Sequence, residues 1–231
     1  PLTFASATGI RTALFQQFPY GLPERSGADA SCRFPALSFL PETVRDLFCQ
    51  SKPLWPEDFS SLLNGKILEL SQAEDRGAAE FGKISDISSD LALRLSRLAL
   101  DITGWEDRIA QLKTRQYTYT RINRAFTKIL LGIAKEPIAA WKDLGYAPYA
   151  RILGFNKGAA PLFAELKKSS RIPLITKPAA AFSCLSGPAL EEFQKDLYAS
   201  HLYQCAFCQR YPDAGHAVLK NEFNRKLLVL E

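Results

Sequence analysis

The spacing of apolar residues changes once along the chain, near residue 146, and that change limits the possible folds more than any other feature. Before residue 146, apolar side chains recur three or four positions apart, which is the period of an amphipathic helix. After it, residues 149–155 and 172–176 are predicted to be strands, with a helix over residues 157–169 between them. A strand, a helix and a strand within about 28 residues predict a βαβ unit with parallel strands.

The helical part is dominated by one apolar stripe in residues 85–103, where Ser88 or Ser89 can cap the predicted helix. The stripe consists of Leu91, Leu95, Leu98, Ala99 and Ile102. Further helices are predicted over residues 7–17, 41–49, 60–70, 105–115, 117–133 and 187–209.

These elements predict a mostly α protein with a small α/β (βαβ) C-terminal part. Proline and glycine interrupt the periodicity over residues 18–36, which predicts a long loop. The predicted divisions of the chain are therefore a first segment over residues 1–36, a helical domain over 37–145 and a small α/β domain over 146–231. The tail, residues 225–230, is predicted either to add a third strand or to pack as an extension.

Composition narrows the class of protein. Of the 231 residues, 47% are hydrophobic and 23% are charged, which excludes a disordered or fibrous chain. No stretch approaches 18 apolar residues, so we expect a cytoplasmic protein that has no membrane partner. The sequence contains no methionine, which indicates either a fragment of a longer chain or a sequence from which modified methionines have dropped out.

The positive charge is concentrated in the second part of the chain. The net charge is +5, with −2 over residues 1–100 and +7 over residues 101–231. A basic surface attracts polyanions, which favours phosphate-bearing partners, although many modestly basic domains carry only a solvated surface.

The most informative segment is the predicted helix over residues 117–133. Residues 108–128 contain six basic residues and no acidic one. The apolar face of this helix is made by Ile122, Phe126, Ile129 and Ile133. The basic face is made by Tyr117, Arg121, Arg124 and Lys128. Such a face suits RNA, because cations attract phosphates and an unstacked base can lie on a tyrosine or arginine plane. The alternative is a solvated face, and the hydroxyl residues before Arg121 are predicted to form an extended lead-in or a cap.

Both histidines of the chain lie near two cysteines, in the order His201, Cys205, Cys208 and His216. Zinc accepts two thiolates and two imidazoles, so this set is a candidate metal site. The first three residues, however, fall on one face of the predicted helix over 187–209. Packing of a buried helix face is therefore favoured over metal binding, and reduced thiols are expected.

Residues 113–124, followed by 129–133, resemble the bacterial tRNA(Met) cytidine acetate ligase family, which is nucleotidyltransferase-like. Further matching segments are residues 149–158, 172–177, 196–200 and 221–226. The resemblance covers nearly the whole chain in order, is strongest over residues 85–177, and corresponds to the C-terminal portion of the family.

The resemblance implies an ATP-dependent ligase. Such an enzyme activates acetate as acetyl-adenylate, releases pyrophosphate, and acetylates the N4 amine of the wobble cytidine in elongator tRNA(Met). Its partners are ATP with Mg²⁺, acetate and the tRNA. Residues 1–36 would be the end of a Rossmann-like nucleotidyltransferase domain plus a loop. The tRNA would be held by the basic face of the helix over 117–133, with help from Lys113 and Arg115.

Ser6-Ala7-Thr8-Gly9-Ile10-Arg11 resembles an element of the family whose arginine contacts ATP, which implies that Ser6, Thr8 and Arg11 bind ATP. The chemistry agrees, because amides and hydroxyls at a helix start hold phosphate oxygens and arginine adds a charged fork. The His-x-Gly-His motif of the family does not occur in these 231 residues, so no general base is assigned and this chain alone is expected to be inactive. The alternatives are a non-catalytic tRNA- or RNA-binding module and a zinc-stabilised interaction domain.

Overall fold

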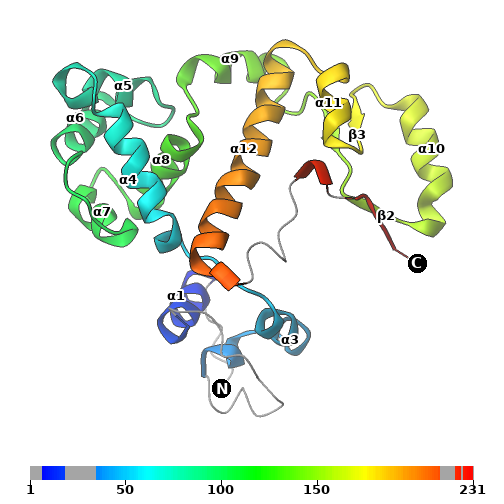
Figure 1. Ribbon diagram of the computed structural model, residues 1–231, viewed down its shortest axis with the longest axis horizontal. Coiled ribbons are helices and arrows are strands. Elements are labelled where there is room, and N and C mark those ends of the chain that lie inside the picture. Colours follow the sequence, from blue (N-terminus) through cyan, green and yellow to red (C-terminus); the bar gives the residue numbers. More distant parts are fainter. Residues whose placement is uncertain (1–6, 19–34, 214–221, 225, 231) are drawn as a thin grey trace. The chain divides into compact units, whose positions relative to one another are not determined.

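The computed structural model describes residues 7–18, 35–213, 222–224 and 226–230 (Figure 1). The chain divides into two compact units, Pro1–Trp55 and Pro56–Glu231. The boundary therefore follows residue 55, whereas the sequence predicted divisions after residues 36 and 145. The further division of residues 56–231 into a helical and an α/β domain stays a prediction.

The first unit is held by a small apolar cluster. It contains α1 (Ala7–Gln17), the 3-10 helix η1 (Pro35–Phe39) and α3 (Glu42–Gln50). Both α-helices were predicted. The cluster is made by Leu14, Phe18, Leu37 and Trp55.

The second unit begins with a run of helices that share one core. These elements are η2 (Pro56–Phe59), α4 (Ser60–Leu70), η3 (Glu74–Gly77), α5 (Ala78–Lys83), α6 (Ser89–Arg97), α7 (Trp105–Leu112), α8 (Tyr119–Leu131) and α9 (Lys135–Asp143). Helix α8 lies against α4, and the ring of Trp105 meets the ring of Phe126 edge to face at 5.2 Å between centroids. Aromatic pairs prefer this arrangement. Helices α5 and α9 were not predicted.

The predicted helix over residues 85–103 is wrong at both ends, because α6 covers only Ser89–Arg97. Ser88 caps it as predicted, since its hydroxyl accepts a hydrogen bond from the amide of Leu91. Leu91, Leu95 and Ala99 are buried, but Ile102 is 65% exposed because it lies beyond the helix.

The early end of α6 has a physical cause in Arg108, which is fully buried on α7. Its guanidinium donates to the carbonyl of Leu98 at 3.0 Å, to the carbonyl of Asp101, and to the side chain of Asn64 at 2.7 Å. The guanidinium thus binds the Leu98 carbonyl, which a helix continuing to residue 103 would have used for its own hydrogen bond, and the Asp101 carbonyl beyond it. Burial lowers the pKa of Arg108 from its usual value.

The rest of the second unit contains short parallel strand pairs beside a long helix. Its elements are β1 (Ala150–Arg151), β2 (Gly154–Asn156), η4 (Lys157–Ala159), α10 (Ala160–Ser169), β3 (Leu174–Ile175), α11 (Pro178–Cys184), α12 (Gly187–Arg210), η5 (Glu222–Asn224) and β4 (Leu228–Leu230). Helix α11 was not predicted. Helix α12 confirms the predicted helix over residues 187–209, and it lies beside α8 and α9 (Figure 1).

The strand predicted over residues 149–155 is divided between two sheets. β1 pairs in parallel with β3, with α10 between them in the sequence, whereas β2 pairs in parallel with β4. The chain changes partner between Ile152, whose amide binds Ile175, and Leu153, whose carbonyl binds Leu228. Gly154 permits the second pairing, because a Cβ there would lie 2.8 Å from Leu228. The predicted third strand at the tail is therefore present, in a sheet of its own with β2.

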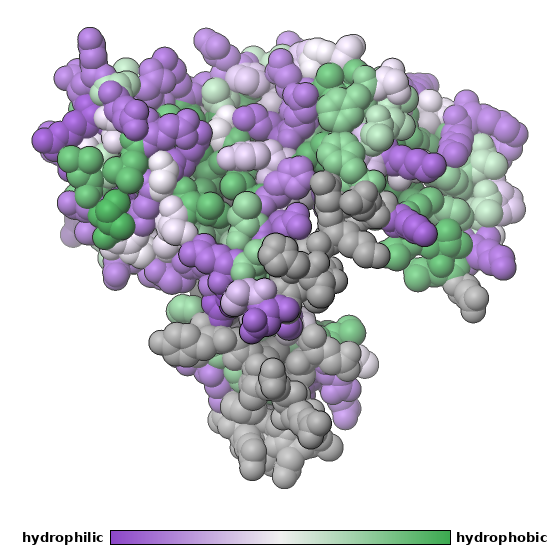
Figure 2. All heavy atoms as spheres, in the orientation of Figure 1, coloured by the Kyte–Doolittle hydropathy of each residue, from purple (hydrophilic) through white to green (hydrophobic). Residues whose placement is uncertain are grey.

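Apolar side chains are exposed around α10 and the β2–β4 pair, where Figure 2 shows green surface. They are Leu153, Leu162, Leu166, Leu228, Val229 and Leu230. Across the described residues, no helix has the length and hydropathy that a membrane crossing requires.

We expect Arg108→Ala to lower the free energy of unfolding by about 3 kcal/mol, because it leaves buried carbonyl oxygens and Asn64 without their charged partner. Urea denaturation followed by circular dichroism measures the change. Arg97→Ala on exposed α6 surface is the control, with a change of within about 0.5 kcal/mol. Equal losses for the two variants would contradict the structural role of Arg108.

Candidate nucleic-acid interface

Local sequence signals define both ends of α8. Thr118 caps its start, with the hydroxyl accepting a hydrogen bond from the amide of Arg121, as predicted for the hydroxyl-rich lead-in. Gly132 ends it in the left-handed conformation, at a φ of 59°. The predicted helix over residues 117–133 is therefore two residues too long at each end. The face toward the core contains Ile122, Ala125, Phe126, Ile129 and Leu130.

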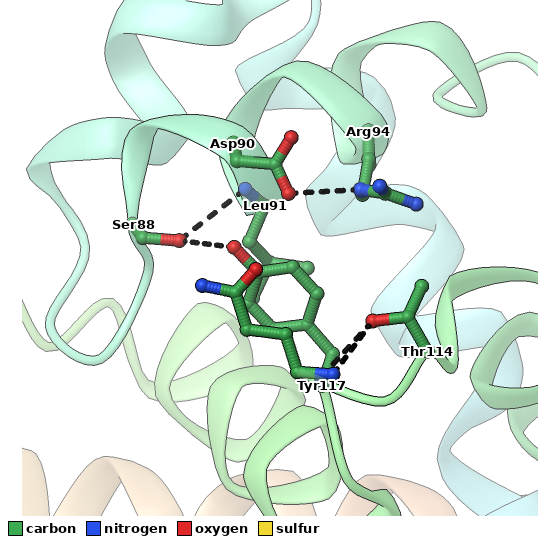
Figure 3. A network of polar contacts seen from close by, with 7 residues as sticks. Ser88, Asp90, Leu91, Arg94, Thr114 and Tyr117 are labelled. Carbon is green, nitrogen blue, oxygen red and sulfur yellow. Dashed lines mark hydrogen bonds and ion pairs between the residues drawn. The ribbon is translucent and has the colours of Figure 1, made fainter.

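Tyr117 is not the exposed base-stacking ring that the sequence predicted, because only 1% of it is accessible. It lies before α8 rather than on it, and its ring is part of the helical core. Its hydroxyl shares a hydrogen bond of 2.7 Å with the hydroxyl of Ser88, the residue that caps α6 (Figure 3). An RNA base cannot stack on a ring that is covered in this way.

The covered ring of Tyr117 contacts cations from two helices. The guanidinium carbon of Arg121 on α8 lies 4.9 Å from the ring centroid, and that of Arg94 on α6 lies 5.8 Å from it. Both distances are within the range of cation–π attraction. Arg94 could not be predicted from the basic pattern of α8, because it belongs to another helix and only the packing of α6 on the lead-in to α8 brings it here.

Arg94 is also tied to its own helix, since its Nε donates to Asp90 at 2.9 Å one turn earlier (Figure 3). The hydrogen bond from Arg94, followed by one from the Tyr117 hydroxyl, lowers the pKa of Asp90 below its usual value. In the part of the chain that the structure describes, Arg121 contacts no carboxylate.

The other two cations of the predicted basic face share one carboxylate. Asp86 accepts from Nε of Arg124 at 2.9 Å and from Nζ of Lys128 at 2.8 Å. Lys128 also donates to the hydroxyl of Ser85. Asp86 has a φ of 64°, in the left-handed region that aspartate tolerates better than most residues. These contacts, the hydrogen bond from Lys128 first, hold the pKa of Asp86 below its usual value.

Lys113 and Arg115 lie on the short connection between α7 and α8, and both are exposed. The connection is closed by Thr114, whose hydroxyl accepts from the amide of Tyr117 at 3.1 Å and whose own amide donates to the carbonyl of Tyr117. The basic surface therefore combines residues of α6, the α7–α8 connection and α8. Arg108 does not belong to it, because it is buried.

A hollow of about 400 Å³ opens beside the C-terminal end of α8, among α4, α9 and α12. Trp141 and Tyr198 form part of its wall. Lys195 also lines it, but its ammonium donates to the carbonyls of Leu131 and Gly132 at the end of α8. The ammonium of Lys195 is consequently already engaged by backbone carbonyls.

The predicted ATP-binding residues are only partly within the described chain. Arg11 is exposed on the second turn of α1. Ser6 lies outside the described residues, and the side chain of Thr8 does too, although its backbone belongs to α1. Of these three side chains, the structure therefore describes only that of Arg11.

The cysteine and histidine cluster is not assembled in the described residues. His201, Cys205 and Cys208 all lie on α12 as predicted, and His216 lies outside the described residues. No group of three potential ligands that could hold a metal occurs in the described parts of the chain. The expected burial of this face is wrong for Cys205, which is exposed.

Comparisons with known proteins agree with the fold and the resemblance. The family described as HIGH Nucleotidyl Transferase matches residues 1–216. The tRNA(Met) cytidine acetate ligase of Bacillus subtilis strain 168 is 31% identical over 204 residues, covering 86% of this chain and 43% of that protein. The enzyme of the same name from Thermoanaerobacter sp. strain X514 is 26% identical over 209 residues, covering 88% and 45%. The chain spans about half the length of the curated relatives it matches.

Solved structures of Thermotoga maritima TmcAL are similar in fold. The apo form matches with a TM-score of 0.75 at 20% identity, covering 99% of this chain and 51% of that one. The form bound with alpha-thio ATP also has a TM-score of 0.75 at 20% identity, covering 100% and 53%. At this identity the match establishes the fold, which is helix-rich with few parallel strands.

We expect the stability that Asp86 contributes to disappear in acid. Because its pKa is lowered in the folded chain, its contribution is complete above the unfolded pKa of about 3.9 and is lost as the pH falls through the folded value. Asp86→Asn should therefore unfold more easily than wild type at pH 7, by less than about 1 kcal/mol for so exposed a pair, and equally near pH 2.

Urea denaturation of the two proteins across this pH range measures the effect. Asn tolerates the same left-handed backbone, so the variant isolates the charge. Asp143→Asn, at an exposed carboxylate without an ion pair among the described residues, is the control. A difference between wild type and Asp86→Asn that grows toward low pH would refute the assignment.

Proposed function

The chain belongs to the HIGH nucleotidyl transferase family, and on that premise we propose that it is part of an ATP-dependent ligase acting on elongator tRNA(Met). The product would be N4-acetylcytidine at the wobble position. Support comes from curated relatives that are tRNA(Met) cytidine acetate ligases and from the match of nearly the whole chain to TmcAL.

The proposed reaction has two steps. An acetate oxygen attacks the α-phosphorus of ATP, which forms acetyl-adenylate and releases pyrophosphate. The N4 amine of cytidine then attacks the acetyl carbonyl, AMP leaves, and the amine loses one proton. No general base for that proton is assigned among the described residues, and the parts of the enzyme proposed below are a surface that holds RNA and a site that holds ATP.

The single observation that carries the RNA assignment is the cationic surface formed by α6, the α7–α8 connection and α8. Lys113, Arg115 and Arg124 are exposed on it, and Arg121 and Lys128 are half-buried beside them. Lysine and arginine neutralise RNA phosphates and release counterions, so this surface should give affinity that depends strongly on salt. Tyr117 takes no direct part in the proposed RNA contact, because its ring is covered.

We also assign ATP to the first unit. The exposed guanidinium of Arg11 suits the phosphates of ATP, and amides in the first turn of a helix can add hydrogen bonds to a phosphate. Ser6 and Thr8 complete this proposed site, and Mg²⁺ would accompany the nucleotide. A TmcAL structure bound with alpha-thio ATP supports the choice of nucleotide.

The second candidate function is a non-catalytic tRNA- or RNA-binding module. It is favoured by one observation, which is that no His-x-Gly-His motif occurs in the 231 residues. A coding sequence upstream of Pro1 that contains this motif would favour the ligase, and an upstream sequence without it would favour the module.

We expect this chain alone, supplied with ATP, Mg²⁺ and acetate, to release no pyrophosphate above a protein-free blank. The chain spans only about half the length of the relatives, and no general base for the reaction is assigned in it. A coupled colorimetric assay for phosphate after pyrophosphatase treatment measures the release. Sustained release that scales with protein concentration would show that the chain alone catalyses adenylation, and it would contradict this prediction.

We expect Arg124→Glu to weaken binding of unmodified elongator tRNA(Met) by at least about tenfold at low salt, since it places a negative charge where a phosphate would bind. A gel shift at two salt concentrations, with a second tRNA as competitor, measures the effect. Asp86→Asn has the opposite effect on the charge of this surface, because it removes the carboxylate that pairs with Arg124 and Lys128. It should tighten tRNA binding by a few fold.

The matched control is Lys168→Glu on α10, which reverses another exposed cation that is paired with a carboxylate. Wild-type binding by Lys168→Glu, together with weak binding by Arg124→Glu, would support the assigned surface. Equal losses would mean that net charge alone governs binding, and unchanged binding by Arg124→Glu would exclude this surface.

A further inference from the structure

The covered ring of Tyr117 has an arrangement that ordinary packing does not require. Its edge belongs to the helical core, its hydroxyl meets Ser88, and two guanidinium groups lie within 6 Å of its centroid. Two like charges repel each other, so bringing them to one ring costs free energy. The attraction of each cation to the ring offsets part of that cost, and an anion that contacts both cations would offset more of it.

We propose that Arg94 and Arg121, held over the ring of Tyr117, form a clamp for a backbone phosphate of the bound RNA. Tyr117 acts in it as a positioning residue that never touches the RNA. The proposal rests on the RNA-binding function proposed above. It adds a residue from α6 that the basic pattern of α8 does not reveal.

The hydrogen bonds of the two arginines fit this role. Arg94 uses its Nε on Asp90, and its two terminal nitrogens make no hydrogen bond to the described residues. The side chain of Arg94 is 40% exposed, so those nitrogens can reach a ligand. Arg121 makes no side-chain hydrogen bond within the described chain, and its contact is the ring itself. Guanidinium groups bind phosphate through pairs of parallel N–H donors, and both arginines have such donors available.

Arg124 and Lys128 differ from Arg121, because both already bind the carboxylate of Asp86. A phosphate must displace or share that carboxylate to reach them. Among the described residues, Arg121 meets only the ring of Tyr117, which carries no net charge, whereas Arg94 also pairs with Asp90 through its Nε. Arg121 therefore keeps its full charge for an arriving phosphate, and Arg94 keeps its two terminal nitrogens as donors.

The first test compares Arg94→Gln with Arg97→Gln in the 231-residue chain. Each variant removes one positive charge from α6, but only Arg94 contacts the ring. We expect Arg94→Gln and Arg121→Gln each to weaken tRNA(Met) binding about five- to tenfold and to lower the salt slope by about one. Arg97→Gln should stay within about twofold of wild type. Equal effects of Arg94→Gln and Arg97→Gln would overturn the clamp.

The second test separates positioning from folding. Tyr117→Phe keeps the ring and loses the hydroxyl, with its bond to Ser88 and its interaction with Asp90, so binding should stay within about twofold of wild type. Tyr117→Leu removes the ring, and binding should fall about three- to fivefold. Combined with Arg121→Gln, Tyr117→Leu should add little further loss, because both changes disable one clamp. Fully additive losses in the double variant would overturn the positioning role.

Thermal unfolding of each variant identifies the temperature at which it is folded, and binding is measured there. Should Tyr117→Leu not fold, the Arg94, Arg97 and Arg121 variants still decide the clamp. ATP added as a competitor distinguishes the source of the phosphate. Loss of RNA at micromolar ATP in wild type, but not in Arg121→Gln, would assign the clamp to a free nucleotide and overturn the RNA assignment.

The outcomes also distinguish a failure of the proposed clamp from a failure of the proposed RNA-binding function. Weak binding by Arg124→Glu with unchanged binding by both Arg94→Gln and Arg121→Gln would leave the RNA surface in place and remove the clamp. Wild-type binding by all these variants would exclude both the RNA surface and the clamp.

Discussion

The helical part of the second unit depends on one buried cation. Arg108 has no exposed surface, and its partners come from the end of α6, from the turn after it and from Asn64 on α4. A charge inside an apolar core is stable only where oxygen atoms replace the lost water. The guanidinium therefore ties the end of α6 and the turn after it to α7 and α4. The connection from α7 to α8 returns to the start of α6, where Ser88 meets Tyr117.

The cations near α8 occupy two kinds of environment, and these have different consequences for an anionic partner. Arg124 and Lys128 surround Asp86, whose carboxylate neutralises much of their field. Arg94 and Arg121 lie over an aromatic ring, which attracts them through its quadrupole and adds no charge of its own, and of these two only Arg94 also pairs with a carboxylate of the described residues, that of Asp90. The affinity of this surface for a phosphate therefore depends on the partners of its cations as well as on their number.

Features set by neighbouring residues could be predicted from the sequence, and features set by distant ones could not. The cap at Thr118 and the apolar stripe through Ile122 and Phe126 are local, so α8 was found to within two residues at each end. The stop of α6 depends on Arg108, several residues beyond that helix, and the helical period alone extended it to residue 103. The division of one extended run into two sheets depends on residues near 228, far along the chain.

The contrast between local and distant determinants also explains which residues of the candidate site could be predicted. Charge density over residues 108–128 was visible in the sequence, but the depth of each side chain was not. Arg108 and Tyr117 both lie in that run and both are buried, whereas Arg94 joins the surface from another helix. An aromatic residue among cations predicts base stacking only where its ring is accessible, and at Tyr117 the neighbouring helices cover it.

Burial of that ring changes what an aromatic residue can contribute to binding. An exposed tyrosine would offer a base one stacking face, but its side chain and the long arginine side chains would each lose freedom on binding. A tyrosine fixed by the core and by Ser88 has already lost that freedom, and the cations it attracts are held before any ligand arrives. Its backbone also closes the connection that displays Lys113 and Arg115, through both hydrogen bonds to Thr114. One buried residue thereby links the stability of the helical core to the arrangement of cations from three successive segments.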